Sequence, residues 1–309
     1  MHRLSLALCL IALPLAGTVT GAVAGEPGPF AAFDAASEAV LENPHDLALG
    51  QDGRLYVADL GNNRIAMLDP ETLALVGEIG AAELGASHDV GFDAAGRMLV
   101  ADTLHDRIAI FEGGVLTGTL TGRIGRPEGV AERPSGRIYA TGAWSDTIVA
   151  FEDVQPVASA GGLSAPHGIA VDSAGDLWVT DAGNDRLVTF SPELEVLAVL
   201  DAPEHGWSGP RYLDIDAAGN LVVADKYSHQ VKKLTPEGLM TGVIGAGAGL
   251  GSNRFRTPEG VEISGTTLFF SDSGNYRVVR YRIVTNYPGL FIRVPDLVGG
   301  DGLNCGCGV

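Results

Sequence analysis

The sequence has 309 residues, 46% of them hydrophobic, which is enough for one large all-β domain or two ordinary domains. Its 38 acidic and 20 basic residues give a net charge of −18, so the field of the whole molecule would repel phosphates and a nucleic-acid partner is not expected. The 43 glycines and 16 prolines predict many tight turns between short strands.

Residues 1–24 have the layout of a signal peptide. A basic tip is followed by an apolar run and by Ala22, Val23 and Ala24, and we expect cleavage after Ala24. Pro14 and Gly17 interrupt the apolar run, which is short for a membrane span, and no later segment qualifies. The sequence therefore predicts an extracytoplasmic protein, periplasmic or secreted, with no membrane span.

A repeating unit follows, and its opening segment returns every 39 to 48 residues. The six opening segments are "NPHDLAL" at residue 43, "ASHDVGF" at 86, "RPEGVAE" at 126, "APHGIAV" at 165, "GPRYLDI" at 209 and "TPEGVEI" at 257. Each is followed by a turn, a short strand, a second turn and a third strand. A helix-free unit of this size cannot bury its own faces, so side-by-side repetition predicts the blades of a β-propeller.

The second strand of most units ends in aspartate. These residues are Asp59, Asp102, Asp181, Asp225 and Asp272, and an arginine follows five residues later in four of the units (Arg64, Arg107, Arg186 and Arg277). We expect them to be structural: each aspartate accepts hydrogen bonds from the backbone of the next turn and pairs with its arginine. The third unit matches least well, with Thr141 in the place of the aspartate.

Segments such as "LYVADLGNNRI" resemble the NHL-repeat family, and the resemblance covers about residues 40–284. It implies an all-β, six-bladed β-propeller, to which we assign residues 25–284. The segment "PFAAFDAASE" should close the ring by completing the last blade, with Gly289–Val294 as the alternative. Residues 285–309 are expected to form an irregular tail that carries Cys305 and Cys307.

One position of each opening segment is polar in all six units. In a propeller the first strand of a blade lines the central channel, so this position lies at a channel mouth, and we call its occupants the mouth residues. They are His45, His88, Glu128, His167, Arg211 and Glu259. A packing position would hold aliphatic residues, so the ring predicts either a hydrated mouth or a site for a ligand.

The imidazole and carboxylate groups of the mouth residues favour a metal-binding site in this ring. Alternate blades face a common centre, which makes His88, His167 and Glu259 a two-histidine, one-carboxylate set suited to zinc or non-haem iron. The other three mouth residues would then supply an acid or base, Glu128 or His45, and a cation, Arg211. A competing metal set consists of His45, His88 and His167.

The segments "NPHDLAL" and "APHGIAV" also resemble the zinc-binding segments of peptidyl-α-hydroxyglycine amidating lyases, which are six-bladed propellers of the same type. That resemblance implies Zn²⁺ held by three histidines and a C–N bond cleavage assisted by a tyrosine and an arginine. His45 and His167 match best and His88 less well, and Arg211 and Tyr212 are the candidates for the assisting pair. Here, however, the histidines fall in blades one, two and four.

Two further functions remain open. A calcium-dependent lactonase of the senescence-marker-protein type would use Glu128 or Glu259 as an oxygen ligand, but its asparagine ligands have no counterparts in the ring. The other function is a binding scaffold whose channel mouth takes a small molecule, a peptide or a protein. The sequence favours the scaffold over the enzyme, because the full lyase set is not matched. The scaffold needs no cofactor, whereas the enzyme needs Zn²⁺ or another divalent metal.

Overall fold

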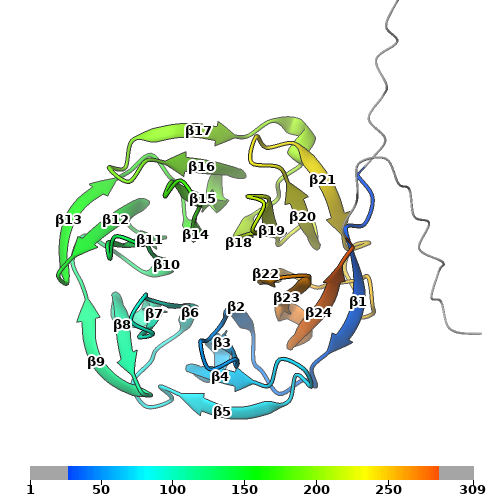
Figure 1. Ribbon diagram of the computed structural model, residues 1–309, viewed down its shortest axis with the longest axis horizontal. Coiled ribbons are helices and arrows are strands. Elements are labelled where there is room, and N and C mark those ends of the chain that lie inside the picture. The colour runs from blue at the N-terminus through cyan, green and yellow to red at the C-terminus, as the bar shows by residue number, and fades with distance from the viewer. Residues whose placement is uncertain (1–26, 285–309) are drawn as a thin grey trace, which may run out of the picture.

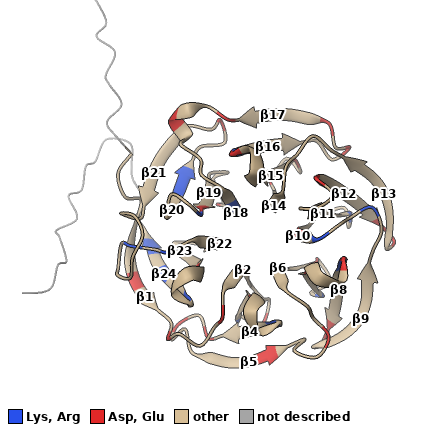
Figure 2. Ribbon diagram, turned by 180° about the vertical axis from the view of Figure 1, so that it is seen from behind, with Lys and Arg blue, Asp and Glu red and all other residues tan. Residues whose placement is uncertain are grey.

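The computed structural model describes residues 27–284, which form six four-stranded antiparallel sheets arranged around a central channel (Figure 1). This confirms the prediction of an all-β, six-bladed propeller. In the described part of the chain, no helix has the length and apolar character needed to cross a membrane. Seen from behind, acidic and basic residues are scattered over the loops and strands around the ring (Figure 2).

Each of the first three blades runs in chain order from the channel outward. Blade one has β2 (Pro44–Leu49), β3 (Leu55–Asp59), β4 (Arg64–Leu68) and β5 (Leu75–Ile79). Blade two has β6 (Ser87–Phe92), β7 (Met98–Asp102), β8 (Arg107–Glu112) and β9 (Val115–Leu120). Blade three has β10 (Pro127–Glu132), β11 (Ile138–Gly142), β12 (Thr147–Glu152) and β13 (Gln155–Ala160).

Blades four and five repeat this order, whereas blade six takes its outer strand from the other end of the chain. Blade four has β14 (Pro166–Val171), β15 (Leu177–Asp181), β16 (Arg186–Phe190) and β17 (Val196–Leu200). Blade five has β18 (Pro210–Ile215), β19 (Leu221–Asp225), β20 (Gln230–Leu234) and β21 (Met240–Ile244). Blade six has β22 (Pro258–Ser264), β23 (Thr267–Asp272), β24 (Arg277–Ile283) and β1 (Ala31–Ala36).

The ring is closed by β1, which pairs antiparallel with β24 from Ala31 opposite Ile283 to Ala36 opposite Val279 (Figure 1). This confirms that the N-terminal segment completes the last blade. The alternative strand Gly289–Val294 lies outside the described residues, as do the expected signal peptide and Cys305 and Cys307.

The apolar core is divided among the interfaces between blades. The second strand of each blade is buried along nearly its whole length; β3, for example, is buried at every residue. One cluster joins Leu55 and Val57 of blade one to Phe269 and Val278 of blade six. Because every blade buries both faces against its neighbours, the closed ring leaves only the outer strands and the loops in water.

Short 3-10 turns link the second and third strands in four of the blades. They are η1 (Leu60–Asn62), η2 (Thr103–His105), η3 (Ala182–Asn184) and η5 (Ser273–Asn275), whereas η4 (Pro203–His205) precedes blade five. Asp59 shows how this turn is held: its carboxylate accepts from Arg64 Nε at 2.8 Å, from Asn62 Nδ2 at 2.8 Å and from the Glu42 backbone N–H at 2.6 Å. The predicted arginine pair is present. The backbone donor, however, lies before the first strand, so the aspartate ties two turns together.

Blade three departs from this pattern at a different residue than the sequence suggested. Gly142, not Thr141, lies opposite Pro127 in the register that pairs Asp59 with Pro44 in blade one. The prediction for Thr141 was therefore wrong by one residue. Ser145 replaces the aspartate as the acceptor of one hydrogen bond, because its Oγ accepts the Gly125 backbone N–H at 3.2 Å.

Candidate functional site

The mouth residues lie where the innermost strand of each blade breaks its register. In blade one Pro44 pairs with Asp59 and Leu47 with Val57, so His45 and Asp46 together face the single residue between those partners. The same irregularity follows the first residue of every innermost strand. A bulge of this kind turns a side chain out of the sheet, which here directs it toward the channel.

The residue two positions before each mouth residue has a left-handed backbone. Its φ is positive at Asn43, Ala86, Arg126, Ala165, Gly209 and Thr257. Only one of these six is a glycine, so the conformation is imposed by the surrounding turn, since it is uncommon for other residues. This repeated turn places all six mouth side chains on one ring.

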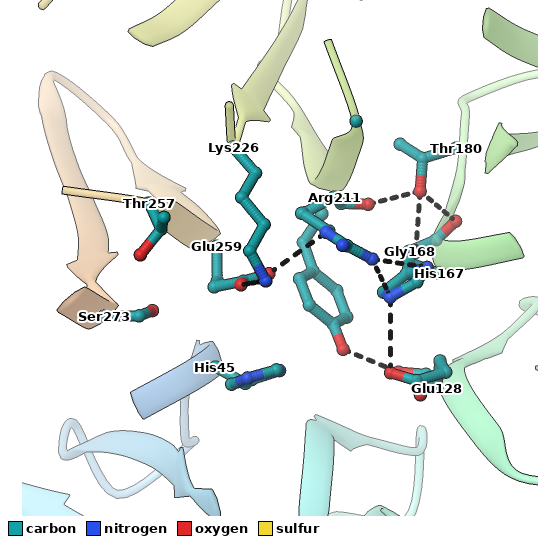
Figure 3. Close-up of polar contacts among 12 residues, drawn as sticks. His45, Glu128, His167, Gly168, Thr180, Arg211, Lys226, Thr257, Glu259 and Ser273 are labelled. Atoms are coloured by element: carbon teal, nitrogen blue, oxygen red, sulfur yellow. Dashed lines mark hydrogen bonds and ion pairs between the residues drawn. The ribbon is translucent and has the colours of Figure 1, made fainter. Parts of the chain in front are cut away.

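Three of the mouth residues converge on one point. His45, His88 and Glu128 each offer a ligand atom, and these atoms lie within 4.8 Å of one another. The His45 and His88 rings meet edge to face with centroids 4.6 Å apart. Glu128 Oε2 lies 3.4 Å from His88 Nε2 and 3.6 Å from His167 Nε2 (Figure 3 shows Glu128 beside His167).

Two of the histidines are oriented by the chain just before them. His88 Nδ1 lies 3.0 Å from the Ala86 carbonyl oxygen, and His167 Nδ1 lies 2.8 Å from the Ala165 carbonyl oxygen. A carbonyl can only accept, so Nδ1 carries the proton in both rings and Nε2 keeps its lone pair. Histidines that bind metals are commonly fixed by such a backbone hydrogen bond.

The other half of the ring is an ion-pair network. Arg211 Nε lies 3.6 Å from Glu259 Oε2, and Lys226 Nζ forms an ion pair with Glu259 Oε1 (Figure 3). The Arg211 guanidinium also contacts His167 Nε2. Glu259 is thus held between two cations, and His167 faces Arg211.

This arrangement differs from the alternate-blade set that the sequence favoured. Of His88, His167 and Glu259, only His88 belongs to the converging group, where the neighbouring mouth residues His45 and Glu128 join it. The roles of all these residues stay predictions.

Lys226 is a site residue that sequence reasoning missed. It follows the recurrent aspartate of its blade, at the position held by Leu60, Thr103, Ala182 and Ser273 in other blades. Since the corresponding residues in those blades are small or apolar, the long cationic side chain of Lys226 was the signal that the sequence offered. Because the second strand ends next to the following blade, this position reaches the mouth residue of that blade, which is Glu259.

Burial controls the protonation of the ring. It lowers the pKa of His45 to about 3, helped by the charges of Lys226 and Arg211, and it lowers the pKa of His88 to about 3 as well. The pKa of His167 is held well below its usual value by burial and then by Arg211. Burial raises the pKa of Glu128 to about 8. The imidazoles are therefore neutral at physiological pH, as metal ligation and base catalysis both require.

Polar atoms of the ring are left without partners among the described residues. His45 Nδ1, Glu128 Oε2 and Arg211 Nε are buried and have no hydrogen-bond partner. Buried polar groups are normally satisfied, and exceptions point to a missing ion, water or ligand.

Tyr212 has a supporting position. It is only 1% exposed, and its hydroxyl donates to the Glu128 backbone carbonyl at 3.0 Å. Its ring lies edge to face against His45 and His167. In the structure this tyrosine lies behind the mouth residues, and the catalytic role that the sequence offered for it stays a prediction.

Hydroxyl groups from the preceding blade hold three mouth residues by their carbonyl oxygens. Ser271 donates to His45, Thr141 donates to His167 and Thr180 donates to Arg211. The corresponding residues in the other three blades are alanines: Ala58, Ala101 and Ala224. These hydroxyls could not be recognised from the sequence, because their role depends on contacts between blades.

Below the ring the channel continues as a cavity of about 280 Å³. Its lining includes the carboxyl groups of Asp46, Asp89, Asp214 and Glu262. Burial, followed by the neighbouring Asp89, raises the pKa of Asp46 well above its usual value, and burial raises the pKa of Asp89 to about 6. Burial thus favours the protonated forms of these two acids, in contrast with the ring above them, where Arg211 and Lys226 face Glu259.

Comparisons with known proteins agree with the fold. The NHL repeat family model matches residues 41–66 and 163–190, which lie in blades one and four. The chain thus carries NHL repeats on a six-bladed propeller. A search of curated proteins finds no match.

Solved structures of propellers resemble the chain at low sequence identity. A catalytically inactive histidine-to-alanine variant of virginiamycin B lyase from Staphylococcus aureus, with quinupristin, is 16% identical, covers 78% of this chain and 95% of its own, and has a TM-score of 0.60. A streptogramin B lyase is 15% identical over 79% of this chain and 84% of its own, with a TM-score of 0.61. An auxiliary nutrient binding protein from Bacteroides ovatus is 19% identical over 82% of this chain and 71% of its own, with a TM-score of 0.63.

Proposed function

We propose that this propeller is a metal-dependent enzyme of the lyase class that acts outside the cytoplasm, with its site at the channel mouth. The observation that supports this most is the convergence of His45, His88 and Glu128, whose ligand atoms lie within 4.8 Å of one another. Two neutral imidazoles and a carboxylate with unpaired buried atoms make a donor set that zinc, or iron of the non-haem type, prefers.

The donor set leaves room for chemistry. Three protein ligands are what catalytic zinc sites provide, with a further position open to water or substrate. When bound, the ion would act as a Lewis acid on an oxygen of the ligand. Nε2 of His88 is free to bind the ion, because Nδ1 donates to the Ala86 carbonyl oxygen. The Tyr212 hydroxyl donates to the Glu128 backbone carbonyl and so fixes the backbone of that ligand.

The remaining mouth residues suit binding and proton transfer. Arg211 and Lys226 provide two cationic side chains beside Glu259, and a substrate anion can compete with that carboxylate for Arg211. His167 is neutral, and its Nε2 contacts Arg211 and Glu128. When the Arg211 guanidinium turns toward a substrate, Nε2 of His167 is free to act as a base beside that substrate. In an elimination, His167 would accept the proton from the substrate carbon as the bond to the leaving group breaks.

The structural neighbours support this choice of class. Two of them are named as lyases, and in virginiamycin B lyase a histidine-to-alanine variant is catalytically inactive. A histidine-dependent lyase can therefore be built on this fold.

A binding protein without catalysis is the second candidate. Its supporting observation is the Lys226–Glu259–Arg211 network, in which both cations available to a substrate already pair with the carboxylate of Glu259. The nutrient binding protein from Bacteroides ovatus shows that a similar fold occurs in a binding protein. In this case the mouth would hold a polar ligand and release it unchanged.

The deciding experiment measures the metal content of residues 25–309 purified without chelator, for the wild type and for His88→Ala, Glu128→Gln and His105→Ala. His105 belongs to blade two but lies on η2, outside the ring, and is the matched control. We expect about one zinc or iron per chain in the wild type and in His105→Ala, and a loss of at least tenfold in affinity in the other two variants, because each removes one ligand.

A wild type that neither contains a metal nor takes up added zinc would refute the metalloenzyme. Metal that persists at full stoichiometry in both ring variants would show that it binds elsewhere. If the ring does bind metal, activity against quinupristin and against peptides that end in α-hydroxyglycine separates the lyase from the binding protein, since only the lyase produces cleaved product.

A further inference from the structure

Three blades carry a large apolar side chain beside the mouth where the other three carry glycine. The position is the second after the recurrent aspartate or its equivalent, and its occupants in chain order are Gly61, Leu104, Trp144, Gly183, Tyr227 and Gly274. Leu104 is 57% exposed, Trp144 is 73% exposed and Tyr227 is 57% exposed. We call these three side chains the rim.

The rim residues lie directly on the segments that lead into the mouth residues. The backbone N–H of Leu104 donates to Gly85 at 3.0 Å, and that of Trp144 donates to Gly125 at 3.1 Å. Gly85 and Gly125 each come three residues before a mouth residue, His88 and Glu128 respectively.

Glycines lie beside two of the rim residues. A Cβ added at Gly85 would be crowded, at 3.0 Å from His105 Cε1 and 3.3 Å from Leu104 Cβ, whereas a Cβ added at Gly125 would make an ordinary contact at 3.7 Å from Trp144 Cβ. Blade one has the opposite arrangement. Its loop residue is Gly61, the large residue is Glu42 in the segment before the mouth residue, and a Cβ added at Gly61 would collide with the Glu42 side chain. The large residue is on the loop only in blades two, three and five.

Cationic groups of the site hold the two aromatic rings in place. The Arg126 guanidinium lies 3.9 Å from the Trp144 ring centroid, and Arg126 comes two residues before Glu128. Arg211 Nη2 donates to the Tyr227 hydroxyl at 3.3 Å, and Lys226 Nζ lies 5.6 Å from the centre of the same ring. Ordered aromatic groups bind apolar partners with little further loss of entropy.

We propose that the rim binds the apolar body of the substrate while its anionic group enters the ring of mouth residues. The substrate class is thus an amphiphilic carboxylate with an aromatic or bulky cyclic portion. The inference rests on the proposed function of the ring, which supplies the polar half of the ligand's contacts through Arg211 and the metal-binding set. Exposed apolar side chains on the loops around a polar mouth suit a ligand that has both an apolar and an anionic part.

The test compares two probes that share a carboxylate and differ by a ring, phenylacetate and acetate, in calorimetric titrations of the zinc-loaded protein. The rim variant is Leu104→Ala with Trp144→Ala, and Tyr227 is kept because it contacts Arg211. The matched control is Val196→Ala with Leu197→Ala, two exposed apolar residues of β17 on the outside of the ring. We expect phenylacetate to bind about tenfold more tightly than acetate to the wild type and the control, and within about twofold of acetate to the rim variant.

Tryptophan fluorescence provides a second reading. Of the three tryptophans, Trp178 and Trp207 are 7% and 8% exposed, so Trp144 alone faces the solvent. Phenylacetate should shift the Trp144 emission to shorter wavelength, whereas acetate should not.

Equal affinities of the wild type for the two probes, or an undiminished preference in the rim variant, would overturn the proposal. Zinc content is measured on the same samples and tests the ring separately. If zinc binds at full stoichiometry but the rim makes no difference to the preference for phenylacetate, the substrate class alone is refuted. A wild type that takes up no zinc refutes the proposed function of the ring.

Discussion

The protonation of Glu128 links the mouth residues to pH. Its pKa of about 8 means that, below this pH, a metal ion must displace a proton from the carboxyl group, whereas His45 and His88, with pKa values of about 3, are already neutral. We expect the affinity for zinc to rise about tenfold per pH unit up to about pH 8 and then to level off. Competition with a chromophoric chelator between pH 6 and 9 measures this dependence.

Glu128→Gln is the control for that dependence. The amide has no proton to displace in this range, so the variant should bind zinc more weakly at pH 8 and lose most of the slope. A wild type with the same slope as the variant would assign the proton to another group.

The raised pKa values of Asp46 and Asp89 make stability depend on pH in a defined direction. Burial raises the pKa of both carboxyls in the folded state, so the folded protein binds protons that the unfolded chain has released. Stability is therefore highest at low pH in this range and falls as the pH rises from about 4 through 6 and beyond. Asp46→Asn should unfold at a higher temperature than the wild type at pH 8 and differ less at pH 5, because one buried carboxylate is gone.

Thermal unfolding at the two pH values checks this expectation, with Asp153→Asn, an exposed loop residue, as the control. The explanation fails if Asp46→Asn is no more stable than the wild type at pH 8.

At the scale of single elements, each buried aspartate connects two turns of its blade. One turn precedes the first strand, and the other follows the second strand. Asp181 Oδ1 accepts the Ser164 N–H at 2.6 Å, and its Oδ2 accepts Arg186 Nε at 2.6 Å and Asn184 Nδ2 at 2.8 Å. Asp181→Ala leaves these donors without an acceptor and should lower the free energy of unfolding by about 2–4 kcal/mol. Urea denaturation measures it, and Asp201→Ala, exposed in a loop, should stay within about 0.5 kcal/mol. Equal effects of the two substitutions would contradict the structural role.

The strands, blades and mouth residues could be predicted because they repeat. Six copies of one pattern identify the alternation of each strand, and the positions at which Pro44 and Pro166 precede a histidine stand out against it. The pairing of mouth residues could not be predicted, since it depends on the bulge after Pro44 and on which neighbours it turns inward. Lys226 was missed for the same reason, because its partner Glu259 comes from the next blade.

At the scale of the whole molecule, stability depends on the joint between the two ends of the described chain. Phe30 precedes β1, is 3% exposed and packs in a cluster with Phe255, Phe270 and Tyr281. Phe30→Ala should lower the free energy of unfolding by about 3–5 kcal/mol, because it opens a cavity in blade six. Phe33→Ala, at a position 42% exposed on the same strand, should cost much less. Chemical denaturation compares the two, and similar losses would mean that the joint is held by pairing of the strands alone.

Closure by β1 also sets an order of events during synthesis. The segment that completes blade six leaves the ribosome before the other strands of the propeller, and the residues of β24 that pair with it follow about 240 to 250 residues later. Until then β1 lacks the strand with which it pairs, and Phe30 can contact only the blade-five part of its cluster, while blades one to five can already assemble. A messenger cut short anywhere within the last blade would therefore yield an open arc with two unpaired edges, which cellular quality control can recognise by its exposed apolar surface.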